Sequence, residues 1–592
     1  MKKIFNKIVA IFITIMMLLP QGVFALTFDQ KIGMNGHIDV PKDILVAGGV
    51  VREYHNFGWS ITQNKQMYFE RFSWWDFDGY YKYLNERGIT ILPCIQMGEQ
   101  SVFNRNRNEK PVMKGDDTTD PMSYKIHSNY LFNYAARYGK TKVDPSRLNL
   151  DPNDTVKTGL GYITYYEDWN EPDKTWQGPD AQFNSTELAA MLSADYDGHE
   201  GKLGQNYGVK QADPNSKLVM GGMAGGATMV KWLNEMQEWA NKNRTDKKLP
   251  LDVINYHQYA GTHSPENSSF VSDAMQIINW RNKNAKDKEI WITEFGWDTN
   301  LGSTKHAAPS EDTQRDWIIR EYLIGDRIGL DRMTVYDALN DGPANDTTQY
   351  STSGLATKVS EGTVKKSSWY GVNTAKNTLK GYTFNRVIEE SKNIYIYEYT
   401  NGKDLIYVLW SPTENGSKIN NYSLNIGNYT KASLTELKNK ETLGVTSKLT
   451  INNNIVKVNV SESPIFVKVS EKKQESTDKK EEPKKEEETT PQPEQKKSEN
   501  ETTTIIKAET ITKTKTTKTK TSTKENISKE ETIIPKSNEK IDIDTIINRS
   551  NQELEQNKKE ISSNTIKLWQ YLIVIVELFI ILTSLCILKK RF

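Results

Sequence analysis

Apolar and polar positions along residues 26–382 follow two alternating patterns, and the alternation predicts the architecture of this region. Eight short apolar segments have the character of buried strands, at residues 31–36, 49–53, 90–96, 161–170, 217–223, 253–257, 289–293 and 332–336. Segments with helical periodicity lie between most of them, at residues 77–87, 185–205, 229–243, 269–284 and 310–325. Eight strands alternating with helices indicate an α/β fold, a (β/α)8 TIM barrel. The polar segment 101–130 lacks either pattern, so we expect a long loop after the third strand.

The pattern changes after residue 382, where alternation replaces helical periodicity. Residues 394–399 read Ile-Tyr-Ile-Tyr-Glu-Tyr, and Asn401-Gly402 separates them from an apolar run at 405–410. Further strand-like runs follow at residues 422–426, 447–451, 455–460 and 465–469. This pattern predicts a small all-β sandwich over residues 383–470. Two roles stay open for it: a structural partner packed on the barrel, or a glycan-binding module.

The N-terminal segment has the pattern of a secretory signal peptide. It begins with the basic residues Lys2, Lys3 and Lys7, continues with an apolar run, and ends at the small-residue site Val23-Phe24-Ala25. We therefore expect residues 1–25 to be removed on export.

The C-terminal segments predict a linker and a membrane anchor. Residues 471–567 hold 21 Lys and Arg, 21 Asp and Glu, and neither aromatic residues nor glycine, a composition that cannot bury enough apolar area to fold. The apolar run 568–588 is long enough for a transmembrane helix, and the cations that follow it place the tail 589–592 in the cytoplasm. We therefore expect the barrel on the extracellular face of a bacterial cell membrane.

Composition excludes several classes of function. Lys and Arg number 77 and Asp and Glu 76, so the chain lacks the basic excess of a nucleic-acid-binding protein. The only cysteines, Cys94 and Cys586, fall in an apolar barrel strand and in the anchor, so we expect no disulfide. The sequence has no glycine-rich phosphate loop and no His-Glu-x-x-His helix, so we expect neither a cofactor nor a metal.

Two glutamates occupy matching places in the strand series. Glu171 follows the fourth predicted strand and Glu294 follows the seventh. Because the carboxyl ends of barrel strands meet at one mouth, we expect both carboxyl groups to flank one cavity. Cleavage of a glycosidic bond needs such a pair, one to protonate the leaving oxygen and one to attack the anomeric carbon.

The residues around these glutamates carry a resemblance to a known group of enzymes. Residues 166–172 read Tyr-Glu-Asp-Trp-Asn-Glu-Pro and residues 293–297 read Thr-Glu-Phe-Gly-Trp. Both motifs resemble clan A of the retaining glycoside hydrolases, and families 5, 30 and 39 share them equally well. The resemblance implies an oligo- or polysaccharide substrate with β-linkages, Glu171 as the acid/base and Glu294 as the nucleophile.

The same resemblance implies roles for several neighbours. Asn170 would hydrogen-bond the sugar 2-hydroxyl, and Arg52 would lower the pKa of the nucleophile. His257 and Tyr259 match the clan's His-x-Tyr, in which the tyrosine contacts the nucleophile and the histidine contacts the substrate or the acid/base. The physical chemistry agrees for Arg52, since a nearby cation favours an ionised carboxylate.

One departure concerns the sugar platform, which the clan usually builds from a tryptophan at the end of the eighth strand. Here that position holds Tyr336, so the platform is expected from Tyr336, Trp297 or Trp176. Further candidates for hydroxyl contacts are Asn35, His37, His55 and Trp59. Two alternatives to hydrolysis stay open: a cell-surface transglycosylase with the same residues, and a non-catalytic carbohydrate-binding adhesin.

Overall fold

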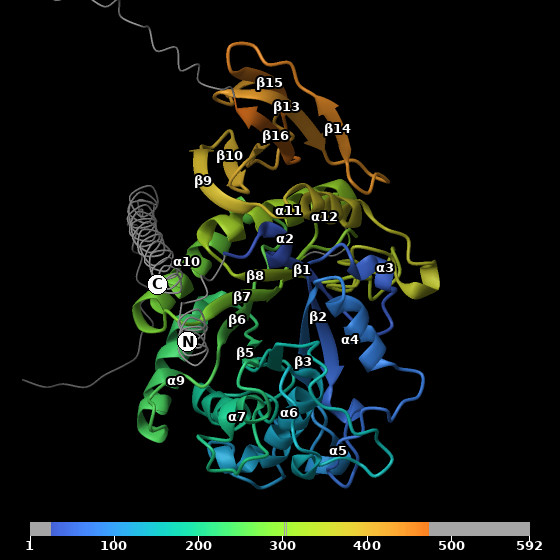
Figure 1. Cartoon of the computed structure of the whole chain (residues 1–592), viewed down its shortest axis with the longest axis vertical. Helices are drawn as coiled ribbons and strands as arrows, with labels where there is room; N and C mark the ends of the chain where they lie inside the picture. Colours follow the sequence, from blue (N-terminus) through green and yellow to red (C-terminus); the bar gives the residue numbers. More distant parts are fainter. Residues whose placement is uncertain (1–24, 301, 303–304, 473–592) are drawn as a thin grey trace, which may run out of the picture. The chain divides into compact units, whose positions relative to one another are not determined.

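The computed structural model describes residues 25–300, 302 and 305–472 of the 592-residue chain. Eight parallel strands close into a barrel in chain order (Figure 1). They are β1 Ile32–Gly36, β2 Val50–Asn56, β3 Thr90–Gln96, β4 Tyr165–Asn170, β5 Lys217–Gly222, β6 Val253–His257, β7 Glu289–Glu294 and β8 Arg332–Val335. The predicted TIM barrel is therefore confirmed.

Helices follow the strands and cover the barrel. They are α2 Phe28–Lys31, α3 Lys42–Leu45, α4 Phe77–Asn85, α5 Gln100–Phe103, α6 Lys125–Tyr138, α7 Ser185–Asp197, α8 Val209–Ala212, α9 Met229–Asn243, α10 Phe270–Asn284, α11 Glu311–Ile328 and α12 Ser367–Thr378. Strong caps explain several boundaries; Asn184, for example, forms a capping box with Glu187 at the start of α7.

The expected loop over 101–130 is wrong in part, because its last residues begin the long helix α6. Nearly every residue of α6 is buried, including polar ones, so it lacks the amphipathic pattern by which a surface helix is found. Its polar residues find partners in the fold: Ser128 donates to the carbonyl of Ala194 at 2.6 Å, and Arg137 pairs with Asp78 at 2.9 Å.

Two antiparallel sheets follow the barrel, as the all-β prediction requires. One has the strand order β14-β13-β16-β11-β10-β9 and the other pairs β12 with β15. Their bounds are β9 Thr383–Glu390, β10 Tyr395–Thr400, β11 Leu405–Trp410, β12 Ile419–Asn425, β13 Tyr429–Glu436, β14 Val445–Lys448, β15 Ile455–Val460 and β16 Ile465–Lys472. The sequence pattern missed β9 and β13, which alternate weakly.

The β-sandwich contacts the barrel through buried polar groups. Arg320 of α11 forms an ion pair with Glu266 at 2.6 Å, and the indole of Trp410 in β11 donates to the same carboxylate at 2.7 Å. An ion pair this deeply buried holds only when its hydrogen bonds are complete, and here the sandwich supplies one of them.

The predicted linker 471–567 lies outside the described residues but for its first two, and the anchor 568–588 lies wholly outside them. The signal peptide 1–25 likewise falls outside, except for its last residue. Within the described part of the chain, no helix is both long and apolar enough to cross a membrane.

Candidate active site

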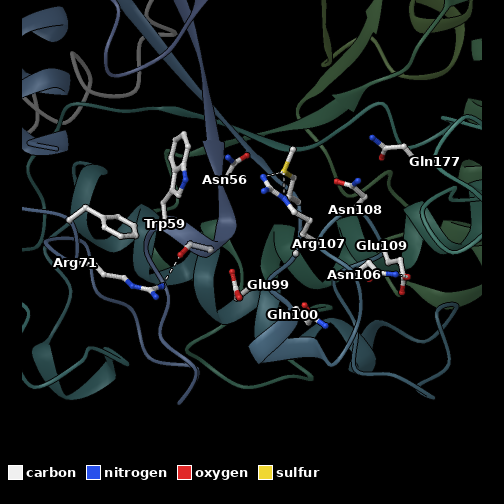
Figure 2. A pocket seen from close by; sticks show the side chains of 14 residues that line it. Asn56, Trp59, Arg71, Glu99, Gln100, Asn106, Arg107, Asn108, Glu109 and Gln177 are labelled. Atoms are coloured by element: carbon white, nitrogen blue, oxygen red, sulfur yellow. Dashed lines mark hydrogen bonds between the residues drawn. The ribbon is translucent and has the colours of Figure 1, made fainter. Parts of the chain in front are cut away.

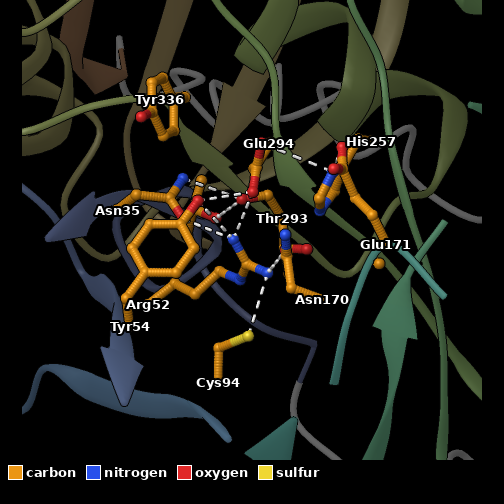
Figure 3. A network of polar contacts seen from close by, with 12 residues as sticks. Asn35, Arg52, Tyr54, Cys94, Asn170, Glu171, His257, Thr293, Glu294 and Tyr336 are labelled. Carbon is orange, nitrogen blue, oxygen red and sulfur yellow. Dashed lines mark hydrogen bonds and ion pairs between the residues drawn. The ribbon is translucent and has the colours of Figure 1, made fainter. Parts of the chain in front are cut away.

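The carboxylate of Glu294 lies at the end of β7 and receives three hydrogen bonds. Arg52 donates to Oε1 at 2.7 Å and Tyr54 donates to the same oxygen at 2.5 Å (Figure 3). Tyr259 donates to Oε2 at 3.0 Å. Burial raises the pKa of Glu294, but His257, Arg52 and the hydrogen bonds outweigh burial and lower it overall. Glu294 is thus held as an anion.

Arg52 of β2 is fully buried and organises the floor of the site. Its guanidinium makes a two-bond contact with Glu167 at 2.5 and 2.9 Å. It also donates to the side-chain oxygen of Asn35 at 3.0 Å and to that of Asn170 at 2.7 Å. The contact with Glu294 that the sequence predicts for Arg52 is present, and this one arginine bridges two buried carboxylates.

Glu171 follows β4 directly, and its carboxyl group lies close to that of Glu294. Its backbone has φ +46°, a left-handed conformation that is uncommon outside glycine and that marks functional turns. His257 of β6 lies between the two carboxyl groups, with Nδ1 3.1 Å from Glu171 Oε1 and 3.5 Å from Glu294 Oε2. One carboxylate oxygen of Glu171 lies within 4.8 Å of one of Glu294.

The charge of His257 follows from these neighbours. Burial lowers the pKa of His257, but the carboxylates of Glu294 and Glu171 raise it by more, so the net shift is upward. The two carboxylates thus favour the charged form of the imidazole, whose Nδ1 lies within hydrogen-bond distance of Glu171 Oε1.

Several residues of this network were not predicted from the sequence. Tyr54 lies two residues beyond Arg52, and the period of two along a strand could have placed both on the inner face of the barrel. Glu167 accepts from the amide of Asn255 at 2.9 Å and from the backbone of Gly222 at 3.1 Å. Its position within the 166–172 motif was a usable signal.

A second wall of the site comes from loops that have no sequence pattern. Tyr350, in the loop after β8, has φ +72° and its ring lies 4.9 Å from that of Tyr259. His306 stacks on Tyr350 with ring centroids 5.3 Å apart. Tyr336 completes this wall: its ring is 5.9 Å from Tyr350, and its hydroxyl donates to Asp341 at 2.6 Å.

Other candidates are not brought to the site. Trp297 is fully buried, its ring against Trp317 and its indole donating to the carbonyl of His263, so it offers no face to a sugar. His55 is also fully buried and contacts Ser60. His55 points from β2 toward helices α4 and α6, and Trp297, beyond the end of β7, packs against α11.

The remaining candidates lie near the mouth. His37 stacks on Tyr54 with centroids 5.4 Å apart, and Asn35 serves Arg52 as an acceptor rather than facing the cavity. Trp59 is half-buried after β2, and Trp176 is 63% exposed.

Two groups of residues in the described part of the chain have the spacing of metal ligands. One is Glu171, His257 and Glu294. The other joins His127, Asp168 and Asp195 behind β4, with His127 Nδ1 2.9 Å from Asp195. Burial raises the pKa of Asp168 and Asp195 and lowers the pKa of His127, so it disfavours the charged form of all three side chains, and no ion is assigned to this group.

Comparison with known proteins identifies the region that holds both glutamates. Residues 165–322 match the glycosyl hydrolase catalytic core family. No curated protein sequence matches the chain. The match begins at β4 and includes β7, so the barrel carries a glycoside hydrolase catalytic domain.

The chain is also similar to solved structures of other proteins. A family 39 glycoside hydrolase from the gut symbiont Bacteroides cellulosilyticus WH2 has a TM-score of 0.54 at 16% identity, covering 75% of this chain and 82% of that one. A glucosidase from Croceicoccus marinus has a TM-score of 0.49 at 11% identity, over 75% of this chain and 96% of that one. A family 30 subfamily 8 xylanase from Clostridium acetobutylicum has a TM-score of 0.48 at 15% identity, over 75% and 97%.

Proposed function

We propose that the barrel is a retaining glycoside hydrolase that cleaves β-linked glycans, with Glu294 as the nucleophile and Glu171 as the acid/base. The observation that carries the proposal is the pairing of an anionic, three-fold hydrogen-bonded Glu294 with a second carboxyl group less than 5 Å away. A retaining mechanism uses carboxyl groups about 5–5.5 Å apart, whereas an inverting one needs about 6.5–9.5 Å to admit water between them. The short separation supports retention.

In the first step, Glu294 attacks the anomeric carbon while Glu171 gives its proton to the departing glycosidic oxygen. The carbon–oxygen bond to the leaving sugar breaks, and an ester between the sugar and Glu294 forms. Arg52, Tyr54 and Tyr259 hold the attacking carboxylate in position, so little reorganisation is needed as its charge passes into the bond.

In the second step, Glu171 takes a proton from a water molecule whose oxygen attacks the same carbon. The ester bond breaks, Glu294 leaves as a carboxylate, and the sugar departs with its original anomeric configuration. His257 contacts the acid/base in both steps, and its Nδ1–H stabilises Glu171 whenever that residue is an anion.

The test of this proposal is the anomer that forms first. The soluble chain 26–470 is incubated with aryl β-glycosides and with β-linked oligosaccharides, and product anomers are followed by NMR before they mutarotate. The proposal expects the β-anomer first and a mechanism-based fluorosugar bound to Glu294 alone. An α-anomer, or label on another residue, contradicts it. Sugar binding without turnover indicates an adhesin, and transfer to a sugar acceptor in preference to water indicates a transglycosylase.

We also propose that the enzyme works at the outer face of the cell membrane, held by the run 568–588 at the end of the linker 471–567. The support is sequence pattern alone: apolar length, flanking cations and a composition that cannot form a core. Fractionation of cells that express either the full chain or a chain ending at Ser470 tests it. The full chain is expected with membranes and the shorter chain in the medium; equal amounts in the medium contradict the anchor.

A further inference from the structure

A large cavity opens at the same mouth of the barrel, beside the glutamates. Its volume is about 750 Å³, within the range of about 300–1,000 Å³ that ligand sites occupy. Its walls come from the loops after β2, β3 and β4 (Figure 2). The catalytic residues described above do not line it.

The position of the cavity relative to the scissile bond follows from strand β2. Arg52 contacts the nucleophile, whereas Asn56 of the same strand lines the cavity. Four residues of strand span about 13 Å at roughly 3.3 Å per residue. Gln177, a few residues beyond Glu171 on the loop after β4, lines the other side. This distance is longer than one sugar ring, so an occupant of the cavity lies beyond the sugar under attack.

The walls have the chemistry that sugar rings require. Trp59 and Phe72 supply flat apolar faces, and Asn56, Asn108 and Gln177 supply amides that can both donate and accept hydrogen bonds. An apolar small molecule would leave these amides without partners in a closed complex. A hydroxyl-rich chain satisfies both kinds of surface at once.

Two arginines leave donors directed at this space. Arg71 donates from Nη1 to the carbonyls of Gly58 and Ile61, at 2.9 and 2.5 Å. Arg107 donates to the sulfur of Met97, at 2.8 and 3.3 Å, and a thioether is a weak acceptor. Neither guanidinium forms an ion pair with a carboxylate of the described residues, so both keep N–H groups for a ligand rich in acceptor oxygens.

We propose that this cavity binds sugar units of the substrate that are remote from the cleaved bond, so the enzyme acts on long glycan chains rather than on short glycosides. The inference rests on the proposed function and extends it to the substrate class. Trp59 stacks on a sugar ring, and Arg71 and Arg107 donate to its ring and hydroxyl oxygens. Binding energy from these remote units then increases kcat/KM for long chains.

Chain-length kinetics test the proposal. The wild-type chain 26–470 is assayed on β-1,4-linked series of glucose, xylose and mannose, from disaccharide to hexasaccharide, beside the matching 4-nitrophenyl β-glycoside. In the series that is cleaved, kcat/KM is expected to rise with length. Arg107→Ala, at an exposed position whose side chain donates to the sulfur of Met97, is expected to lower kcat/KM on the hexasaccharide about five- to tenfold more than on the aryl glycoside.

Two comparisons keep the outcome clear. Arg87→Ala changes an exposed arginine just before the start of β3, at the opposite end of the barrel, and is expected to change neither value. If kcat/KM is independent of length, or if Arg107→Ala lowers both substrates equally, the remote site is wrong while the hydrolase stands. If no substrate of any length is cleaved, or Glu294→Ala stays active, the proposed function itself is wrong.

Discussion

The two ends of strand β7 carry the same residue types in different surroundings. At its start, Glu289 accepts hydrogen bonds from Lys217, Arg332 and Tyr165, near the N-terminal rim of the barrel. At its end, Glu294 accepts from an arginine and two tyrosines. Burial alone would raise the pKa of each glutamate. The cationic and hydrogen-bonding partners lower the pKa by more than burial raises it, so both glutamates remain ionised.

A lowered pKa and an arginine partner therefore do not identify a nucleophile. Glu289 pairs with two cations, Lys217 and Arg332. Arg52, which pairs with Glu294, also pairs with Glu167. Glu294 also has a second carboxyl group, that of Glu171, within 4.8 Å, and both lie next to His257. The proposed catalytic end of β7 is the end where acidic groups outnumber the cations that pair with them and where a histidine lies between two carboxyl groups.

An apolar layer separates these two ends. Inward-facing side chains near the starts of the strands pack together and are fully buried: Val50, Leu92, Val219, Val253 and Trp291. Two residues further along β2 and β7 the same inner face carries Arg52 and Thr293. The inner face of the barrel thus changes from apolar to polar and charged within two residues of a strand. The apolar layer packs directly beneath the charged groups and supports them.

The largest effect is expected from a substitution of Glu294, at the C-terminal end of β7. Glu294→Ala removes the proposed nucleophile, so kcat is expected to fall by several orders of magnitude while circular dichroism stays unchanged. Glu289→Ala is the matched control at the other end of the strand, and it is expected to keep kcat within about twofold. Steady-state kinetics on the best substrate measure both. Equal losses in the two variants would contradict the distinction between the ends.

Arg52→Met comes next, because it leaves Glu167 and Glu294 buried without their cation. Breaking a buried pair in this way costs about 3–5 kcal/mol of unfolding free energy, and activity should fall with it since the pKa of Glu294 rises. Arg332→Met is the control: its partner Glu289 keeps Lys217. We expect the control to retain the kcat of the wild type. Urea unfolding and kinetics on the folded fraction separate the two effects.

The barrel could be predicted because its strands depend on local pattern. The apolar runs at 90–96 and 253–257 match β3 and β6 to the residue, since strands buried on both faces form continuous apolar runs. Helix α6 and strand β13 could not be found in this way. Their residues are determined by tertiary contacts, such as the hydrogen bond that Ser128 donates to the carbonyl of Ala194. Such contacts produce no periodic pattern in the sequence.

The proximity of the two proposed catalytic glutamates was predictable for a related reason. Glu171 directly follows β4 and Glu294 is the last residue of β7, and barrel topology alone brings strand ends together. The wall that contains Tyr350 and His306 was not predictable, because long loops place it and their conformation depends on contacts such as Asp298 with the backbone of Tyr350. Trp297 was misplaced because a residue three positions beyond β7 no longer follows the alternation of the strand.

The third prediction concerns the apolar layer between the ends. Leu92→Ala in β3 removes a fully buried side chain and should lower the unfolding free energy by about 2–5 kcal/mol, the usual cost of such a cavity. Leu92 pairs with Arg52 in the register of β2 and β3, but its aliphatic side chain makes no hydrogen bond or ion pair with the charged network, so kcat of the folded enzyme is expected to stay near that of the wild type. Chemical denaturation gives the first value and kinetics well below the melting temperature the second. A large fall in kcat would mean that the layer also sets the geometry of the site.

The smallest effect is expected when a single hydrogen bond to Glu294, the proposed nucleophile, is removed. Tyr259 donates to Glu294 at 3.0 Å and so favours the charged form of that carboxyl. Tyr259→Phe removes this donor, so the pKa of Glu294 is expected to rise toward its ordinary value. Since the nucleophile must be ionised, the acid limb of kcat/KM then moves to higher pH, by about one unit for a bond to a charged group. Tyr165→Phe removes the equivalent donor from Glu289 at the other end of the strand and should leave the limb in place. A pH profile of kcat/KM for the three enzymes decides the matter: an acid limb that stays fixed in Tyr259→Phe would mean that it reports a group other than Glu294.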